Sequence, residues 1–146
     1  MERYPNVRLN AELTKASSLN RLLRNHELDI AFTMNTAYGH EGIESQPCIP
    51  FHIYAVMRNT HPLARLPKVA YSDLLRHSVI MPDVGDRVFN TFQQYLRHDL
   101  TKLNVKCIVS DPDEDLAIVE ETQSVTFMSK LYLKNHPTLV AKPIIG

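Results

Sequence analysis

The stretch Val105-Lys106-Cys107-Ile108-Val109-Ser110-Asp111-Pro112-Asp113-Glu114-Asp115 decides the fold class. Its first half, Val105 to Val109, is rich in apolar and β-branched residues and predicts a strand. Asp111 is a typical N-cap, Pro112 suits the first helical position, and the acids that follow complement the helix dipole. The stretch therefore predicts a strand that passes directly into a helix.

The same alternation extends on both sides of this stretch. Val79 to Met81 predicts a short strand, and residues 86–98 predict a helix with an apolar stripe. Val125 to Met128 predicts a further strand after the helix that Asp111 caps. Strands joined by helical crossovers run parallel with right-handed connections, so residues 79–128 predict one parallel unit.

A smaller unit of the same kind precedes it. Apolar and polar residues alternate from Val7 to Leu13 and predict a half-buried strand. Ser17 or Ser18 can cap the helix that follows, which we expect to end near His26, and Leu28 to Phe32 predicts a second strand. The fold class is therefore α/β with two lobes and parallel-rich sheets flanked by helices.

Two apolar extended segments connect the lobes. The run from Ile53 to Met57 predicts a buried strand, and Leu139 to Ile145 predicts an extended segment that closes the chain. We expect residues 1–57 to form a first lobe that ends in a crossover strand. Residues 58–138 then form the second lobe, and residues 139–146 form the return crossover strand.

Composition excludes several classes of protein. Of the 146 residues, 44% are hydrophobic and 22% are charged, which is typical of a globular domain. Sixteen basic and sixteen acidic residues cancel, so the chain by itself lacks the positive charge of a DNA-binding domain. The N-terminus shows no signal segment, which favours a cytoplasmic location, where Cys48 and Cys107 are expected to be free, buried thiols.

The motifs of the common catalytic sites do not occur. The four glycines form neither G-x-G-x-x-G nor a P-loop, and no H-E-x-x-H, C-x-x-C or G-x-S-x-G is present. The acids from Asp111 to Glu121 are better explained by a cap and a solvated helix face than by a glycosidase pair. We therefore expect no catalytic residue, no metal and no cofactor, and the chain is not expected to be an enzyme.

Four short strings, in order, resemble one family. Arg3-Tyr4-Pro5-Asn6-Val7 is similar to its Tyr-Pro-x-Val, and Leu22 to Ala31 is similar to "L-L-x-x-G-E-L-D-[LI]-A". His61-Pro62-Leu63-Ala64 is its H-P-L-A, and Val69 to Leu74 is similar to "V-x-x-x-D-L". The chain thus resembles the effector-binding domain of LysR-type transcriptional regulators. His26 replaces the usual glycine, so the helix must end on a residue that tolerates left-handed geometry less well.

The resemblance implies a periplasmic-binding-protein-like (type 2) fold whose first lobe is incomplete, because the family's first strand and first helix have no counterpart here. It implies a homodimer or tetramer that forms through effector domains, and no contact with a membrane. DNA would be bound only through a winged helix-turn-helix domain that this chain does not contain.

The resemblance also implies a small-molecule effector in the cleft between the lobes, where strand-end loops and helix N-termini meet. Ser17, Ser18 and Asp86 could serve as helix caps as well as ligand contacts. Arg87 could clamp a carboxylate or be exposed on the first helical turn. The predicted contacts are Ser17, Ser18, Thr33, Met34, Asn35, Asp83, Val84, Gly85, Asp86 and Arg87.

Two alternatives share the architecture. A solute-binding protein of the two-lobed periplasmic type would carry an export signal upstream. An enzyme with a two-lobed α/β fold, such as a deaminase of porphyrin precursors or a prephenate dehydratase, would need a catalytic constellation that the sequence does not show. A helix-turn-helix encoded upstream would instead identify the regulator.

Overall fold

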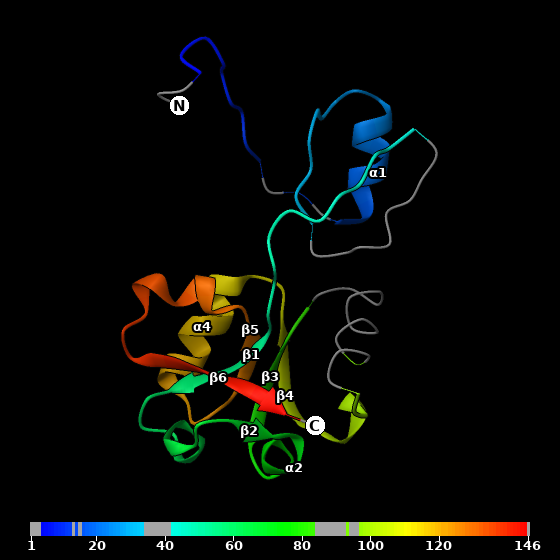
Figure 1. Ribbon diagram of the computed structural model, residues 1–146. Coiled ribbons are helices and arrows are strands. Elements are labelled where there is room, and N and C mark those ends of the chain that lie inside the picture. Colours follow the sequence, from blue (N-terminus) through cyan, green and yellow to red (C-terminus); the bar gives the residue numbers. More distant parts are fainter. Residues whose placement is uncertain are drawn as a thin grey trace. The chain divides into compact units, whose positions relative to one another are not determined.

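The computed structural model describes residues 4–12, 14, 16–33, 42–83, 93 and 97–145. The chain divides into two compact units, unit 1 (Met1–Ile49) and unit 2 (Pro50–Gly146). Figure 1 shows α1 as the helix of unit 1 and the labelled strands in unit 2. Each unit is described by itself below.

Helix α1 (Ala16–Arg24) confirms the predicted helix of unit 1, but it begins before Ser17 and Ser18, so the prediction that one of them caps it is wrong. The helix ends as its sequence requires. Backbone N–H groups of His26 and Glu27 donate to the carbonyls of Leu23 and Leu22, at 3.2 and 2.9 Å. This is the hydrogen-bond pattern of a Schellman motif, which needs a left-handed residue after the helix. His26 adopts that conformation with φ of 56°, so the predicted strain is present.

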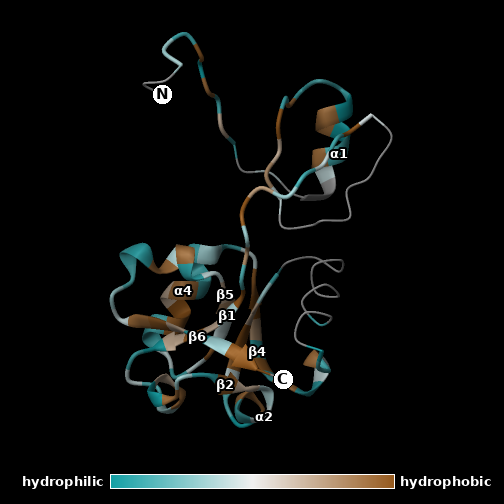
Figure 2. Ribbon diagram, viewed as in Figure 1, coloured by the Kyte–Doolittle hydropathy of each residue, from teal (hydrophilic) through white to brown (hydrophobic). Residues whose placement is uncertain are grey.

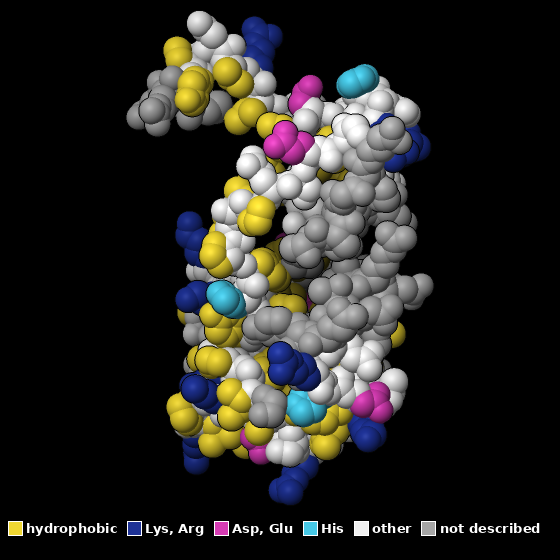
Figure 3. Space-filling view, turned by 45° about the vertical axis from the view of Figure 1, so that its right-hand side comes forward, with side chains coloured by type: hydrophobic (Ala, Val, Ile, Leu, Met, Phe, Trp, Pro, Cys, Tyr) yellow, Lys and Arg dark blue, Asp and Glu magenta, His cyan; other side chains and the backbone are white. Residues whose placement is uncertain are grey.

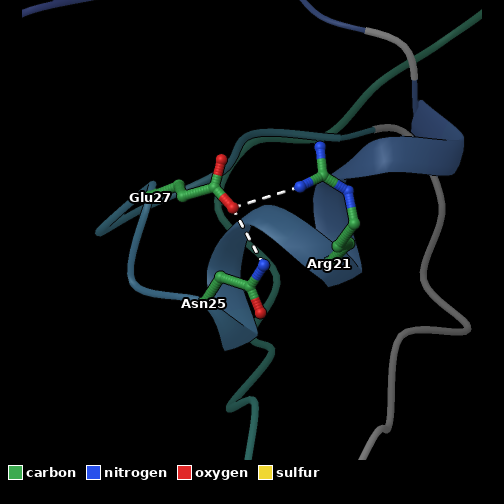
Figure 4. Close-up of polar contacts among 3 residues, drawn as sticks. All are labelled: Arg21, Asn25 and Glu27. Atoms are coloured by element: carbon green, nitrogen blue, oxygen red, sulfur yellow. Dashed lines mark hydrogen bonds and ion pairs between the residues drawn. The ribbon is translucent and has the colours of Figure 1, made fainter.

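Polar side chains tie the same helix end to the chain that follows it (Figure 4). Glu27 Oε1 accepts hydrogen bonds from Arg21 at 3.1 Å and from Asn25 Nδ2 at 2.9 Å. All three side chains are exposed, and an exposed ion pair of this kind contributes at most about 1 kcal/mol. The end of α1 is therefore stabilised mainly by backbone hydrogen bonds.

The prediction of two strands in unit 1 is wrong for the residues that the structure describes. These strands were expected at Val7 to Leu13 and at Leu28 to Phe32. Residues 4–12 and 28–33 form no strand. The side chains of Leu9, Ile30 and Phe32 are 77%, 73% and 80% exposed. Alternation of apolar residues produces a strand only where a partner strand supplies hydrogen bonds and a neighbouring element covers the apolar face.

Unit 2 contains a four-stranded sheet in the order β2-β6-β1-β5. Strand β1 (Tyr54–Arg58) pairs antiparallel with β5 (Thr126–Met128) and with β6 (Leu139–Ile145). Strand β2 (Val69–Ala70) pairs parallel with β6. The predicted strands near residues 53–57 and 139–145 are thus confirmed as direct neighbours in one sheet.

A two-stranded parallel sheet continues the first. Strand β3 (Ser78–Pro82) pairs with β4 (Asn104–Val109), and a parallel bridge between Val79 and Val125 joins β3 to the residue before β5. Helix α4 (Pro112–Glu121) connects β4 to β5. The parallel strand–helix–strand unit that the sequence predicts is therefore present.

Short helices complete unit 2. They are the 3₁₀ helices η1 (Pro62–Arg65), η2 (Leu100–Lys102) and η3 (Lys130–Asn135), and the one-turn α2 (Tyr71–Leu74), where a helix was expected. Most of the helix predicted over residues 86–98 lies outside the described residues. None of the helices in the described part of the chain is long and apolar enough to cross a membrane.

A hydrophobic core lies on each face of the sheet in unit 2. Val56 and Met57 are both fully buried, yet they belong to different clusters because successive strand side chains point to opposite faces. Met57 packs in a cluster with Leu74, and Val56 packs with Leu116 of α4. Figure 2 shows the hydrophobic colours concentrated on the strands and on part of α4. Burying each such side chain contributes about 1.5–3 kcal/mol.

Both cysteines are free, as expected, but the prediction that they are buried is wrong for Cys48, which is exposed. Cys107 on β4 is half-buried. The apolar neighbours of Cys48 suggested burial, but one of them, Ile49, is itself 73% exposed.

Candidate functional site

The carboxyl ends of β3 and β4 meet at one edge of the parallel sheet in unit 2. Asp83 follows β3 and Ser110 follows β4. The hydroxyl of Ser110 donates to Oδ2 of Asp83 at 3.0 Å, and the backbone N–H of Asp83 donates to the carbonyl of Val109 at 2.7 Å. Both side chains are exposed, so this pair presents polar atoms at the edge where open α/β sheets bind ligands.

Helix α4 begins at the same edge and is capped by its own sequence. Asp111 Oδ1 accepts from the backbone N–H groups of Asp113 and Glu114, at 2.8 and 3.2 Å. Pro112 at the first helical position has no N–H. The backbone N–H groups at this helix N-terminus, which could otherwise bind a ligand, therefore already donate to Asp111. The edge offers carboxylate oxygens and a hydroxyl group instead.

Ser129 is a further polar residue at a strand end, and the sequence reasoning missed it. It follows β5, is 3% exposed, and its Oγ accepts from the N–H of Leu131, at 3.4 Å, to cap η3. Because β3 runs parallel to the segment that contains Val125, Ser129 follows its strand at the same edge as Asp83. A serine directly after an apolar strand was the available signal.

A lysine and a tyrosine lie next to this edge. Lys130 follows Ser129, and its Nζ lies 5.9 Å from the ring centroid of Tyr54 at the start of β1. A cation over an aromatic face is attracted by the ring, by about 0.5–1 kcal/mol at an exposed site. Lys130 therefore places a positive charge near the start of β1.

The predicted contact residues divide into three groups. Asp83 lies at the strand edge of unit 2, in contact with Ser110, which is not among the predicted contacts. Ser18 is half-buried in α1, the backbone of Ser17 is part of the same helix, and Thr33 is exposed, all in unit 1. Outside the described residues lie Met34, Asn35, Val84, Gly85, Asp86 and Arg87.

One carboxyl group of α4 has an unusual environment. Asp115 is fully buried, and burial raises its pKa to about 6, although the hydrogen bond from Thr126 acts in the opposite direction. The side chain faces the core of unit 2, where the ionised form is disfavoured. In the described part of the chain, no three side chains of His, Cys, Asp or Glu gather as a metal site would require.

Positive side chains of unit 2 are dispersed on the face seen in Figure 3. Lys and Arg lie singly among hydrophobic and neutral side chains there, without forming one continuous basic surface. This distribution agrees with the zero net charge of the sequence. Nucleic acids are bound by clustered positive charge, which the described residues on this face do not present.

The α/β architecture and the polar strand ends define a ligand-binding domain of the periplasmic-binding-protein-like type. The family model "LysR substrate binding domain" matches residues 1–146. The chain belongs to this family, which confirms the expected fold class. No curated protein matches the chain.

Solved structures with the same fold are distant in sequence. HinK, a LysR family transcriptional regulator from Pseudomonas aeruginosa, has a TM-score of 0.80 and 17% identity, over 99% of this chain and 51% of that chain. The regulatory domain of CcmR from Synechocystis PCC6803 in complex with 2-PG has a TM-score of 0.72 and 16% identity, over 98% and 70%. The effector-binding domain of QuiR in complex with shikimate has a TM-score of 0.66 and 17% identity, over 90% and 62%. This chain thus spans about half the length of HinK.

Proposed function

We propose that this domain binds a small-molecule effector and thereby controls DNA binding and transcription by a LysR-type regulator, without enzymatic activity of its own. The family match carries this proposal. The similar domains of CcmR and QuiR, which hold 2-PG and shikimate, support a small organic effector here. The protein is proposed to act in the cytoplasm, where the regulated DNA lies.

The strand-end edge of unit 2 is the part of the site that the described residues support. Asp83 and Ser110 are exposed and joined, and Asp111 lies beside them. Carboxylate and hydroxyl oxygens bind groups that donate hydrogen bonds, such as hydroxyls and amines. We propose that the effector meets this edge through such donors, with the other predicted contacts completing the site.

The lobes that we propose are residues 1–57 and 58–138, with residues 139–146 as the return crossover. The antiparallel pairing of β1 with β6 supports two crossover strands that lie side by side, from Tyr54 opposite Pro143 to Arg58 opposite Leu139. We propose that effector binding moves the lobes about these strands. An effector changes this equilibrium only by its differential affinity for the two states, typically worth 1–3 kcal/mol.

The regulator is proposed to be a homodimer or tetramer that assembles through effector domains. DNA is proposed to be contacted only by a winged helix-turn-helix domain outside residues 1–146. Solution scattering of the full regulator, with and without its effector, tests the motion. Identical profiles at saturating effector would contradict it.

Thermal-shift titration of the 146-residue chain tests effector binding. The panel contains aromatic and aliphatic acids, amino acids and sugars, because these classes differ in charge and in hydrogen-bond donors. We expect at least one class to raise the melting temperature in a saturable way. The proposal would be contradicted if no compound of the panel raised the melting temperature of the 146-residue chain and none raised that of the full regulator.

A further inference from the structure

His61, the first residue of the H-P-L-A string, is buried in unit 2 and acts as a helix cap. It is 1% exposed, its backbone N–H donates to the carbonyl of Arg58, and its Nδ1 accepts from the N–H of Leu63 at 3.1 Å. An imidazole nitrogen accepts a hydrogen bond only when it carries no proton. The cap of η1 therefore exists only while the ring is neutral, with its hydrogen on Nε2.

A second histidine opposes protonation of the first. The ring of His77, in the turn between α2 and β3, lies edge-on to the His61 ring with 4.7 Å between centroids. Burial and the charge of His77 lower the pKa of His61, while the backbone carbonyl of Gln123 acts in the opposite direction. On adjoining elements, Arg58 ends β1 and Arg65 lies in η1, and both are cations that would not stabilise a charged ring.

The capped helix links two strands of the sheet. Leu63 of η1 is buried in the core with Met57 and Val69. Helix η1 lies between β1 and β2, and β2 pairs with the carboxyl end of β6, where Val69 lies opposite Ile144. Losing the cap therefore affects the segment that places β2 beside β6.

We propose that His61 and His77 form a proton-sensitive switch, in which protonation of His61 uncaps η1 and loosens the connection from β1 to β2. A proton on Nδ1 would face the N–H of Leu63, where a hydrogen bond now forms, and the charged ring would face His77. The folded form binds this proton less readily than the unfolded form. The stability due to the cap is therefore complete above the usual pKa of about 6.5 and is lost as pH falls below it.

Hydrogen exchange of the Leu63 amide in the 146-residue chain tests the switch. Rates are measured between pH 7.5 and 5.0 and corrected for the intrinsic pH dependence of exchange. We expect protection of Leu63 to fall by up to tenfold for each pH unit below about 6.5. The Ile80 amide, which donates to the carbonyl of Val125 at 2.9 Å, is the internal control and is expected to lose no protection as pH falls. Constant protection of Leu63 across the range would overturn the proposal.

Two variants separate the switch from other pH effects. His61→Asn keeps an acceptor at the cap but does not titrate, so protection of Leu63 should become independent of pH. His77→Asn removes the neighbouring charge, so the pKa of the capped ring is lowered less and the total loss of protection should be smaller and level off at a higher pH. If His61→Asn loses protection as the wild type does, the proposal is wrong.

Ring ¹⁵N spectra of the wild type give an answer that requires no variant. A proton on Nδ1 of His61 at pH 7.5 would overturn the proposal, and a proton on Nε2 supports it. None of these measurements involves an effector, so their failure would leave the proposed function unaffected.

Discussion

The hydroxyl of Thr126 on β5 donates a 2.7 Å hydrogen bond to Oδ2 of Asp115 on α4, and both residues are fully buried. Oδ1 of Asp115 has no hydrogen-bond partner. A buried carboxyl group with one bonded oxygen is poorly suited to carry a charge, which is why burial raises its pKa to about 6. The pair joins α4 to β5 and makes the stability of unit 2 depend on pH.

Asp115→Asn should flatten this pH dependence. The pKa of Asp115 rises from about 3.8 in the unfolded chain to about 6 in the folded one, so the folded form binds the proton more tightly. The contribution of protonated Asp115 to the free energy of unfolding is complete below pH 3.8. It is lost as pH rises through 6, which lowers that free energy by about 3 kcal/mol. Denaturant unfolding of wild type and variant from pH 4 to 8 measures the difference. Asp113→Asn, an exposed change on the same helix, is the control, and an equal slope in Asp115→Asn and wild type would refute the prediction.

His26→Gly should stabilise the end of α1. A residue with a Cβ pays about 1–2 kcal/mol in the left-handed conformation, and glycine does not. We expect a gain of about 1 kcal/mol, seen as slower exchange of the Asn25 and Glu27 amides, which donate to carbonyls of α1. His26→Ala retains the strain and should change little. Faster exchange in His26→Gly would show that His26 makes a stabilising contact.

Asp111→Ala should destabilise α4. The side chain satisfies two N–H groups of the first turn, and losing such a cap costs about 1 kcal/mol. Thermal unfolding of unit 2 measures the effect. Asp113→Ala, on the same turn, is the matched control. Equal melting temperatures for the two variants would mean that water replaces the cap without loss.

Ser110→Ala and Asp83→Ala should weaken binding of an effector found by the thermal-shift panel. Each removes one polar group of the strand edge, and we expect losses of about 5- to 30-fold in affinity, from about 1–2 kcal/mol per hydrogen bond. Ser17→Ala and Arg87→Ala test the contacts that the resemblance implies. Ser72→Ala, exposed on α2, is the control. If all four variants bind as the wild type does, the effector site lies elsewhere.

The isolated chain should associate through unit 1 or exchange rapidly there. Leu9, Ile30 and Phe32 are each more than 70% exposed, and apolar side chains exposed in this way favour pairing with another chain. Leu9→Ser with Phe32→Ser should reduce association in sedimentation velocity, whereas Leu131→Ser, 66% exposed in unit 2, should not. Strong exchange protection from Val7 to Phe32 in a monomeric chain would contradict this prediction.

Much of unit 2 could be predicted because its signals are local. Asp111 and Pro112 start α4 where the sequence places them, since a cap needs only its own first turn. The apolar run that contains Val56 and Met57 is buried on both faces, as such runs are in central strands. Of the strand-end edge proposed as part of the site, Asp83 was among the predicted contacts, whereas Ser110 was not.

Tertiary structure decided what depends on distant neighbours. Leu28 to Phe32 alternates like a strand, but ladder hydrogen bonds require a partner strand, and the described part of unit 1 contains none. In the sequence, Asp115 resembles the neighbouring acids of a solvated helix turn. Its burial becomes evident only in the tertiary structure, where it lies against Thr126 of β5. The sequence by itself determined the helix caps and the apolar strands of unit 2, because these depend on adjacent residues. The tertiary structure decided which strands find partners and which polar side chains leave water, because both depend on residues far away along the chain.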